Sequence, residues 1–292
     1  MVRIPFAQSA SKAAEMFTDR VTEVTRLIEH LESKGLRAKQ SRLGEYLRFY
    51  SRYLAGECSS KEVEDTLFFV MREIDEWSWI YRGFTKFEPE GTLERMRQAV
   101  SGVAFAKDEG DDKLARSIQL ELRVASYFIQ TGFSISFSGL SDLVVDVDGY
   151  PVFVECKRLN SPKQVIKRAK EAARQLKARY RTTWKSSYGL VVFDASRIIH
   201  PKQGIVSGPT ETIVRDGMRA QLKAFDQEHD TSEIFGRDKK LISVWMQAIA
   251  PGILRTTNEP FTRFSSLHSI YAQHGQRRWD LFERMKPAFD AS

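Results

Sequence analysis

Three side chains near the middle of the chain could act together on a phosphate group. Twelve residues separate Asp142 from Glu155, and Lys157 lies two positions after Glu155. Carboxylate oxygens are hard ligands that suit Mg²⁺ or Mn²⁺, and a lysine ammonium can reach a phosphate or an attacking water. If the fold brings the three together, they form a site suited to hydrolysing a phosphodiester bond.

The segment between these residues predicts a β-hairpin. Two strand-like runs, residues 143–147 and 152–156, flank an Asp-Gly dipeptide at 148–149, which is typical of two-residue hairpin turns. Such a turn pairs Val147 with Tyr150, and every other pair of facing residues follows from that one. The sequence therefore predicts a register as well as a turn.

This register sets Asp142 directly opposite Glu155. Side chains alternate between the two faces of a strand, so Lys157 shares the face of Glu155 and Cys156 points to the opposite, apolar face. Two carboxylates that face each other repel unless something offsets the repulsion, and a divalent cation would do so. Asp146 shares the Asp142 face but lies about 13 Å farther along the strand, so we expect a solvated surface charge there.

The pattern of Asp142, twelve residues and Glu155-Cys156-Lys157 resembles the PD-(D/E)xK nuclease superfamily, with Ser141 in place of the proline that gives the pattern its name. The resemblance covers about residues 112–194, the middle third of the chain. It implies an α/β fold with a restriction endonuclease-like αβββαβ core and a mixed sheet. The competing interpretation is that these are solvated charges on an exposed sheet face.

The resemblance also implies roles for individual residues. Asp142 and Glu155 would hold Mg²⁺ or Mn²⁺, helped by the backbone carbonyl of Cys156, and Lys157 would orient the attacking water or stabilise charge on the phosphate. In the resembled superfamily the helix before the hairpin often carries an acidic residue close to the metal. Glu121 occupies that position and is a further candidate ligand.

Glu121 lies on a helix predicted from about residue 113 to residue 131, with Gly132 as its stop. Its angular position falls inside the apolar stripe of that helix, and a carboxylate there needs a partner. Two interpretations stay open: a place beside a metal, or an edge position that reaches water or pairs with Arg123 or another nearby Arg. The stripe contains Leu114, Ile118, Leu122, Ala125, Phe128 and Ile129.

A strongly basic segment follows the hairpin. The chain carries a net charge of +7, and residues 155–185 contain eleven Lys or Arg against two acidic residues. A helix after Pro162 would bury an alanine-rich face and expose the charges, which indicates a polyanion such as nucleic acid as partner, or else a solvated face. In several families of the resembled superfamily a Gln on this helix borders the active site, and Gln175 matches it. The predicted nucleic-acid contacts are Arg158, Lys163, Lys167, Lys170, Arg174 and Gln175.

The flanking sequence predicts further elements. Residues 8–100 have helical periodicity, and the aromatic residues at 77–87 are interpreted as core or domain contact rather than as a base-stacking surface. Buried strands are expected at 188–193 and 241–250, whereas the tail after residue 256 is expected to be mixed loop and helix. The predicted division is a helical accessory domain at 1–105, a nuclease-like domain at 106–255 and a C-terminal extension at 256–292.

Composition limits the class of protein. The chain has 292 residues, of which 42% are hydrophobic and 28% charged, as in ordinary globular proteins. No apolar run approaches the roughly 20 residues that span a bilayer, and the N-terminus lacks the apolar core of a signal peptide. We therefore expect a cytoplasmic location and no membrane contact. The two cysteines, Cys58 and Cys156, are too few for a disulfide framework or a zinc site.

These features together predict a metal-dependent nuclease with a Mg²⁺-activated water, and DNA is the favoured substrate. The helical N-terminal region could bind a second copy of the chain or a partner protein. Two other classes remain open. One is a catalytically silent nucleic-acid-binding module or subunit of a larger nuclease or defence complex, and the other is an interaction adaptor built on the N-terminal helices.

Overall fold

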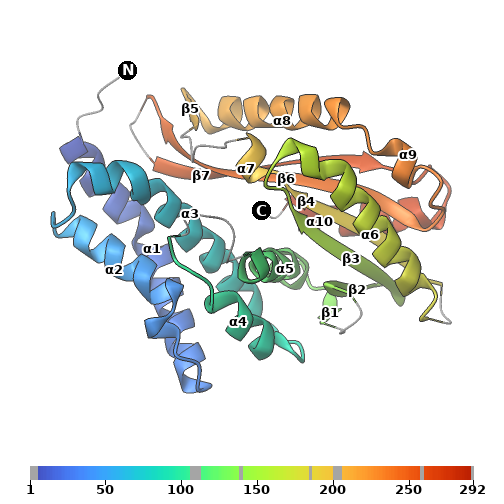
Figure 1. Ribbon diagram of the computed structural model, residues 1–292, viewed down its shortest axis with the longest axis horizontal. Coiled ribbons are helices and arrows are strands. Elements are labelled where there is room, and N and C mark those ends of the chain that lie inside the picture. Colours follow the sequence, from blue (N-terminus) through green and yellow to red (C-terminus); the bar gives the residue numbers. More distant parts are fainter. Residues whose placement is uncertain are drawn as a thin grey trace.

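The computed structural model describes residues 6–105, 113–137, 141–183, 186–199, 206–256 and 260–290. Its described part is a mixed seven-stranded sheet with helices on both faces, beside a bundle formed by the N-terminal helices (Figure 1). The predicted α/β class is confirmed. The segment that follows the predicted boundary after residue 105, residues 106–112, lies outside the described residues. Within the described part no helix is long and apolar enough to cross a membrane.

The sheet is antiparallel at one edge and parallel at its centre. Strand order is β1-β2-β3-β4-β6-β5, and β7 pairs with β6. β1, β2 and β3 form an antiparallel meander, and β3, β4 and β6 run parallel to each other. The strands are β1 (Ser134–Ser136), β2 (Leu143–Val147), β3 (Tyr150–Arg158), β4 (Tyr188–Asp194), β5 (Val206–Gly208), β6 (Leu241–Leu254) and β7 (Pro260–Ile270).

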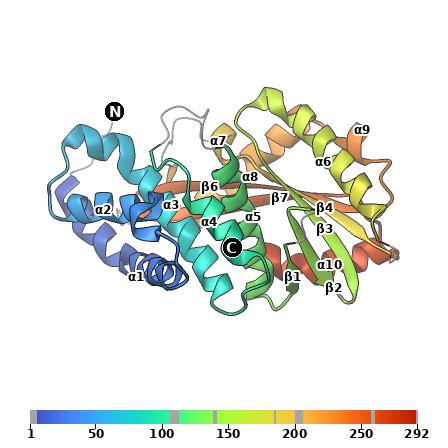
Figure 2. The same ribbon diagram turned by 60° about the horizontal axis from the view of Figure 1, so that its bottom comes forward.

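Helices cover both faces of this sheet. α5 (Lys113–Gln130) and α10 (Arg277–Asp290) pack on one face. α6 (Val165–Tyr180), which follows a 3₁₀ turn at Pro162–Gln164, and α8 (Glu211–Glu228) pack on the other. Figure 2 shows α6 and α10 on opposite sides of the central strands. Because β4 is buried on both faces, it has the uninterrupted apolar sequence from which it was predicted.

The hairpin has the predicted turn and register. Val147 pairs with Tyr150, and Leu143 pairs with Val154 at the far end of the ladder. The turn residues Asp148 and Gly149 have φ angles of 52° and 82°, the left-handed conformation that a tight hairpin turn requires of both central residues. The predicted turn and register are both confirmed. They could be predicted because a two-residue turn determines which residues of the two strands face each other.

The N-terminal helices form a bundle that shares a helix with the sheet. Ser41 and Ser59 cap two of the helices by accepting hydrogen bonds from the backbone N–H groups of Leu43 and Glu62. α5 belongs to both layers. Its residues Ile118 and Leu122 lie in the bundle core, and most of its other buried apolar residues lie in the sheet core. The bundle helices are α1 (Phe6–Ser33), α2 (Arg42–Leu54), α3 (Ser60–Phe84) and α4 (Thr92–Val100), with a 3₁₀ turn at Ala38–Gln40.

Two sequence predictions are wrong. The tail after residue 256 is not mixed loop and helix, since β7 pairs with β6 along most of its length and α10 contributes Phe282 and Met285 to the sheet core. The alternation in β7 is weak and could not be recognised without its partner strand. Leu114 is 70% exposed although it was placed in the buried stripe of α5, because it lies in the first turn of the helix.

A buried network of charges joins the bundle to the sheet. Arg123 of α5 lies 3.2 Å from Glu76 of α3 and 3.2 Å from Asp194 of β4. Arg158 of β3 reaches the same two carboxylates at 3.2 and 3.3 Å. Although burial acts to raise the pKa of Asp194, the two guanidinium groups and Ser196 hold it below its usual value. Four elements are therefore fixed to each other by charges that water does not reach.

Removing one member of this network should strongly destabilise the fold. Arg123→Met leaves two buried carboxylates with less compensation, and we expect the free energy of unfolding to fall by about 3–5 kcal/mol in a urea titration. The matched control is Arg284→Met, because Arg284 pairs with Asp148 where both side chains are exposed. That variant should lose less than about 1 kcal/mol. Equal losses in the two variants would contradict a structural role for the network.

Candidate active site

The hairpin brings the three predicted side chains into contact. The Nζ of Lys157 lies 3.3 Å from Oδ2 of Asp142 and 3.1 Å from Oε2 of Glu155. Asp142 occupies the position just before β2, and the same Oδ2 accepts the backbone N–H of Cys156 at 2.8 Å. The ammonium therefore bridges the two carboxylates at the end of the hairpin farthest from the turn.

The three charged side chains are largely buried rather than exposed to solvent. Glu155 is 0% exposed and Lys157 8% exposed, while Asp142 is half-buried at the rim. The interpretation as solvated charges on an open sheet face is wrong, because α6 covers that face of β3. Cys156 points to the other face, into the apolar core against α5, as predicted. Asp146 is exposed and accepts the N–H of Gly149, also as predicted.

Glu121 pairs with an Arg, which was one of its two open interpretations, and the place beside a metal stays a prediction. Its side chain is buried on α5 and forms an ion pair with Arg95 of α4, so it pairs with a nearby Arg. It also lies within electrostatic range of the three central residues. Burial, followed by the charge of Asp142, raises the pKa of Glu121 to about 8, against the opposing effects of Arg95 and Lys157. The carboxylate thus borders the same cluster.

The surroundings of the cluster raise the pKa values of both Glu155 and Lys157. Burial and the neighbouring Asp142 raise the pKa of Glu155 to about 7, although Lys157 acts in the opposite direction. Burial acts to lower the pKa of Lys157, but Asp142 and Glu155 hold it above its usual value. Burial is thus the main cause of the shift at Glu155, whereas the neighbouring carboxylates cause the shift at Lys157.

One oxygen of the cluster lacks a hydrogen bond within the described residues. Oε1 of Glu155 is buried and accepts none, and Nε of Arg179 lies 3.9 Å from it. Oε1 of Gln175, one helical turn before Arg179 on α6, is also buried and accepts no hydrogen bond from the described residues. Buried acceptors that lack partners are uncommon and need an explanation. Oxygen acceptors of this kind fit a hard divalent cation.

Asp142 and Glu155 could therefore hold Mg²⁺ or Mn²⁺, with the Cys156 carbonyl and Glu121 as further candidates. Across the described residues, no group of three or more His, Cys, Asp or Glu side chains is already gathered closely enough to hold an ion. Instead, the Lys157 ammonium occupies the space between the two central carboxylates. Any ion that binds there would have to share these oxygens with Lys157.

Sequence reasoning missed two arginines beside the cluster. Arg95 reaches Glu121 from α4, in the N-terminal bundle, and no sequence signal connects it to the hairpin. Arg179 reaches toward Glu155 from α6. It follows Gln175 by four positions and so lies on the same side of the helix, which was the available signal. Both missed residues are cations, and each offsets the negative charge of a carboxylate that was predicted to form the site.

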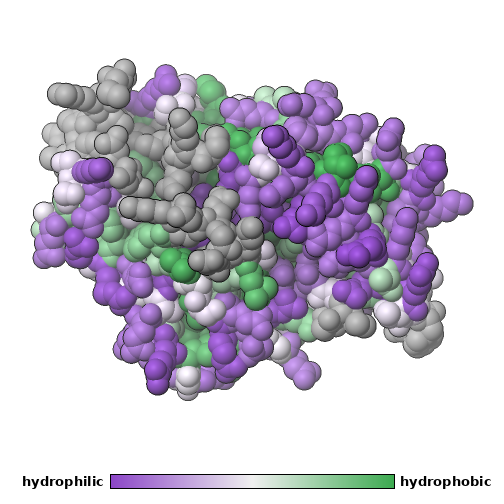
Figure 3. All heavy atoms as spheres, viewed as in Figure 1, coloured by the Kyte–Doolittle hydropathy of each residue, from purple (hydrophilic) through white to green (hydrophobic). Residues whose placement is uncertain are grey.

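The basic segment divides into exposed and buried residues. Lys163, Lys167, Lys170 and Arg174 are exposed on or just before α6, and Figure 3 shows hydrophilic side chains over this part of the molecule. Arg158, also predicted to contact nucleic acid, is instead held by Glu76 and Asp194 in the buried network. It alternates with Lys157 along β3 and therefore points to the opposite face.

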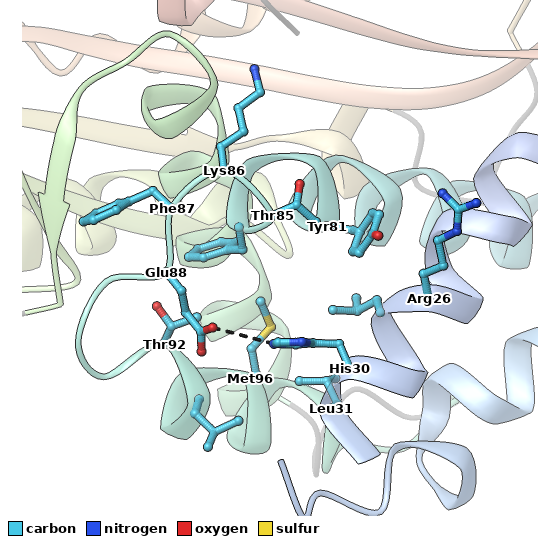
Figure 4. A pocket seen from close by; sticks show the side chains of 13 residues that line it. Arg26, His30, Leu31, Tyr81, Thr85, Lys86, Phe87, Glu88, Thr92 and Met96 are labelled. Atoms are coloured by element: carbon cyan, nitrogen blue, oxygen red, sulfur yellow. Dashed lines mark ion pairs between the residues drawn. The ribbon is translucent and has the colours of Figure 1, made fainter. Parts of the chain in front are cut away.

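A separate cavity of about 370 Å³ lies in the helical bundle between α1, the end of α3 and α4. Figure 4 shows His30 and Glu88 pointing toward one another across it, and their ion pair spans 3.6 Å. Leu31, Met96 and other apolar side chains line the cavity. The described residues that line it include none of those predicted to form the site, so we place the candidate chemistry at the hairpin.

Comparison with known proteins gives no independent guide to this site. No family model matches the chain, and neither the curated proteins nor the solved structures yield a match. Functional inference therefore depends on the residue pattern, the burial of the charges and the distances between them.

The two raised pKa values predict how the metal-free protein responds to pH. A carboxyl group that holds its proton more tightly in the folded protein stabilises the fold at low pH. This contribution is lost as pH rises through the folded-state values of about 7 for Glu155 and about 8 for Glu121. Urea titrations with a chelator should show the free energy of unfolding falling between about pH 5 and about pH 8. The slope should be at most about 1.4 kcal/mol per pH unit for each group.

Glu121→Gln removes one of the two groups and should make this decline shallower. Glu90→Gln is the matched control, because Glu90 is exposed. If the wild-type protein and both variants decline with the same slope, the surroundings of Glu121 do not raise its pKa.

Proposed function

We propose that this protein is a divalent-metal-dependent nuclease that hydrolyses phosphodiester bonds, with DNA as the favoured substrate. The observation that carries the proposal is a buried pair of carboxylates, Asp142 and Glu155, bridged by Lys157 while Oε1 of Glu155 has no hydrogen-bond partner among the described residues. Burying two carboxylates costs free energy, and a site that binds a cation would explain why both are there.

The fold around the site supports the same proposal. α5, β1, β2, β3, α6 and β4 follow one another along the chain in the order that the resemblance implies. β1 to β3 form the meander, and β4 lies beside β3 in parallel. We propose that these elements are a restriction endonuclease-like core, to which β5, β6 and β7 add further strands.

Each residue would contribute through a property that it has in this structure. Asp142 and Glu155 would hold Mg²⁺ or Mn²⁺, with the Cys156 carbonyl and Glu121 as further candidate ligands. Such an ion, when bound, polarises a phosphate oxygen and lowers the pKa of a bound water. Lys157 would orient the attacking water or stabilise the negative charge that develops on the phosphate. Its buried position makes that interaction stronger than it would be in water.

The exposed cations of α6 would hold the nucleic-acid backbone near this site. Lys163, Lys167, Lys170 and Arg174 are solvent-exposed, as contacts to phosphate require. Gln175 is partly buried on the same helix, with its buried Oε1 available as an acceptor. Contacts of this kind position a backbone without reading base sequence.

Cleavage assays test the proposed activity directly. Purified protein is incubated with plasmid, single-stranded DNA and RNA, in Mg²⁺, Mn²⁺ or chelator. We expect metal-dependent cleavage that falls at least about a hundredfold in Asp142→Asn, Glu155→Gln and Lys157→Gln, because each removes charge from the reacting site.

Asp146→Asn is the matched control for these variants. Asp146 lies on the same strand as the site and is exposed beyond its reach. This variant should cleave like the wild-type protein. Metal-dependent cleavage that persists unchanged in Asp142→Asn and Lys157→Gln would place the active site elsewhere in the molecule.

Salt dependence tests the role of α6. Replacing Lys163, Lys167 and Arg174 by Ala should weaken DNA binding and lower the dependence of log K on log salt concentration by about 2–3, since each lost phosphate contact releases one counterion fewer. The matched control replaces Arg215, Arg219 and Lys223, which are exposed on α8. Fluorescence anisotropy across a salt series measures both. If the two triple variants behave alike, α6 is not the binding surface.

One observation favours a second candidate, a catalytically silent nucleic-acid-binding module. Lys157 already neutralises part of the carboxylate charge, so the cluster can persist without an ion. This candidate predicts salt-sensitive DNA binding, no cleavage with any metal, and a melting temperature that Mn²⁺ does not raise.

A further inference from the structure

We infer that Arg95 completes the proposed site from the N-terminal bundle: it pairs with Glu121 until a divalent cation takes that carboxylate, and it then binds a phosphate of the nucleic acid. The inference rests on the proposed function but concerns a residue outside the resembled core. It gives the helical bundle a direct part in substrate binding rather than an accessory one.

Arg95 lies where three elements of the site meet. It projects from α4, forms its ion pair with Glu121 on α5, and places its guanidinium carbon 5.4 Å from the centre of the Phe137 ring. Phe137 follows β1 and stacks on Phe84 at the end of α3, with ring centres 6.2 Å apart. Arg95 is therefore held against an aromatic surface formed by Phe137 and Phe84.

The charges around the cluster balance without an ion. Three carboxylates, those of Asp142, Glu155 and Glu121, each have a cation beside them in the described structure. Lys157 serves the first two, and the partners from the flanking helices are Arg179 for Glu155 and Arg95 for Glu121. A divalent cation held by the same carboxylates would leave this group with an excess of positive charge. That excess is what a phosphate diester requires.

Arg95 is better placed than Arg179 to respond to such an ion. Both arginine side chains are 21% exposed, but Arg179 lies 3.9 Å from a fully buried carboxylate, whereas Arg95 pairs directly with Glu121, whose side chain is 9% exposed. A guanidinium also presents paired N–H donors that match a phosphate. Arg95 and a metal would compete for Glu121, so each weakens the binding of the other by the same factor.

Binding measurements on two arginines of one helix test the inference. Arg95→Gln removes the cation and keeps most of the side-chain volume. Arg97→Gln is the matched control, because Arg97 is 56% exposed on the same helix and its one ion pair among the described residues is with Glu94. Calorimetry with Mn²⁺ alone measures metal affinity. Anisotropy of a short DNA duplex and a single strand in saturating Ca²⁺ measures substrate binding apart from cleavage.

We expect Arg95→Gln to bind Mn²⁺ roughly fivefold tighter or more, because its competitor for Glu121 is gone. The same variant should bind DNA roughly tenfold to a hundredfold more weakly, since a charge-assisted contact to phosphate is lost. Arg97→Gln should match the wild-type protein in both. General damage to the fold would weaken both ligands, so the opposite directions distinguish a role in the site from a structural one. Arg95→Lys, which keeps the charge, should recover part of the DNA affinity.

The outcomes separate this inference from the proposed function. If the wild-type protein cleaves DNA and Arg95→Gln binds both ligands as Arg97→Gln does, the inference is wrong and the nuclease proposal stands. If the wild-type protein binds Mn²⁺ and DNA without cleaving, the two opposite shifts still support the inference, and their absence overturns it. A wild-type protein that binds neither ligand overturns both.

Discussion

The burial of the Glu155 carboxylate is the constraint on which the candidate site depends. A charged group that water does not reach must be compensated by its neighbours or give up its charge. Lys157 compensates one of its oxygens, and the other lies at the longer distance of 3.9 Å from Arg179. Asp142 then adds a second negative charge to the same small volume. Burial and the charge of Asp142 together raise the pKa of Glu155, so this carboxylate favours a proton or a bound cation.

The packing that encloses Glu155 comes from elements distant in sequence. α6 covers one face of β3, and α5 covers the other. α5 also belongs to the bundle core, so the helices at the start of the chain are fixed against the strands that carry the carboxylates. The Arg123 network strengthens this attachment with ion pairs in a region without solvent. A bundle held so firmly can contribute a side chain to the site with a defined position.

Adjacent residues of β3 show how the fold divides its charges. Lys157 points toward α6 and meets the acids of the candidate site, whereas Arg158 points toward α3 and α5 and joins the structural network. Beyond the strand, Lys163, Lys167, Lys170 and Arg174 are exposed, whereas Arg179 is partly buried and lies near the Glu155 carboxylate. The excess positive charge of this segment is therefore of two kinds. Part of it holds the protein together, and the rest is available to a polyanion.

The sequence by itself determined the local geometry of the hairpin. The Asp148-Gly149 turn sets the register, and strand alternation places Asp142, Glu155 and Lys157 on one face, because both depend on neighbours along the chain. The same local rules gave most of the helices and the buried central strands. What only the tertiary structure decided is which distant side chains meet the site. Arg95 and Arg179 lie beside the carboxylates of the site, Arg158 is largely buried in an ion pair with Glu76, and β7 pairs with β6. The sequence could not predict these contacts, because each depends on packing between elements far apart along the chain.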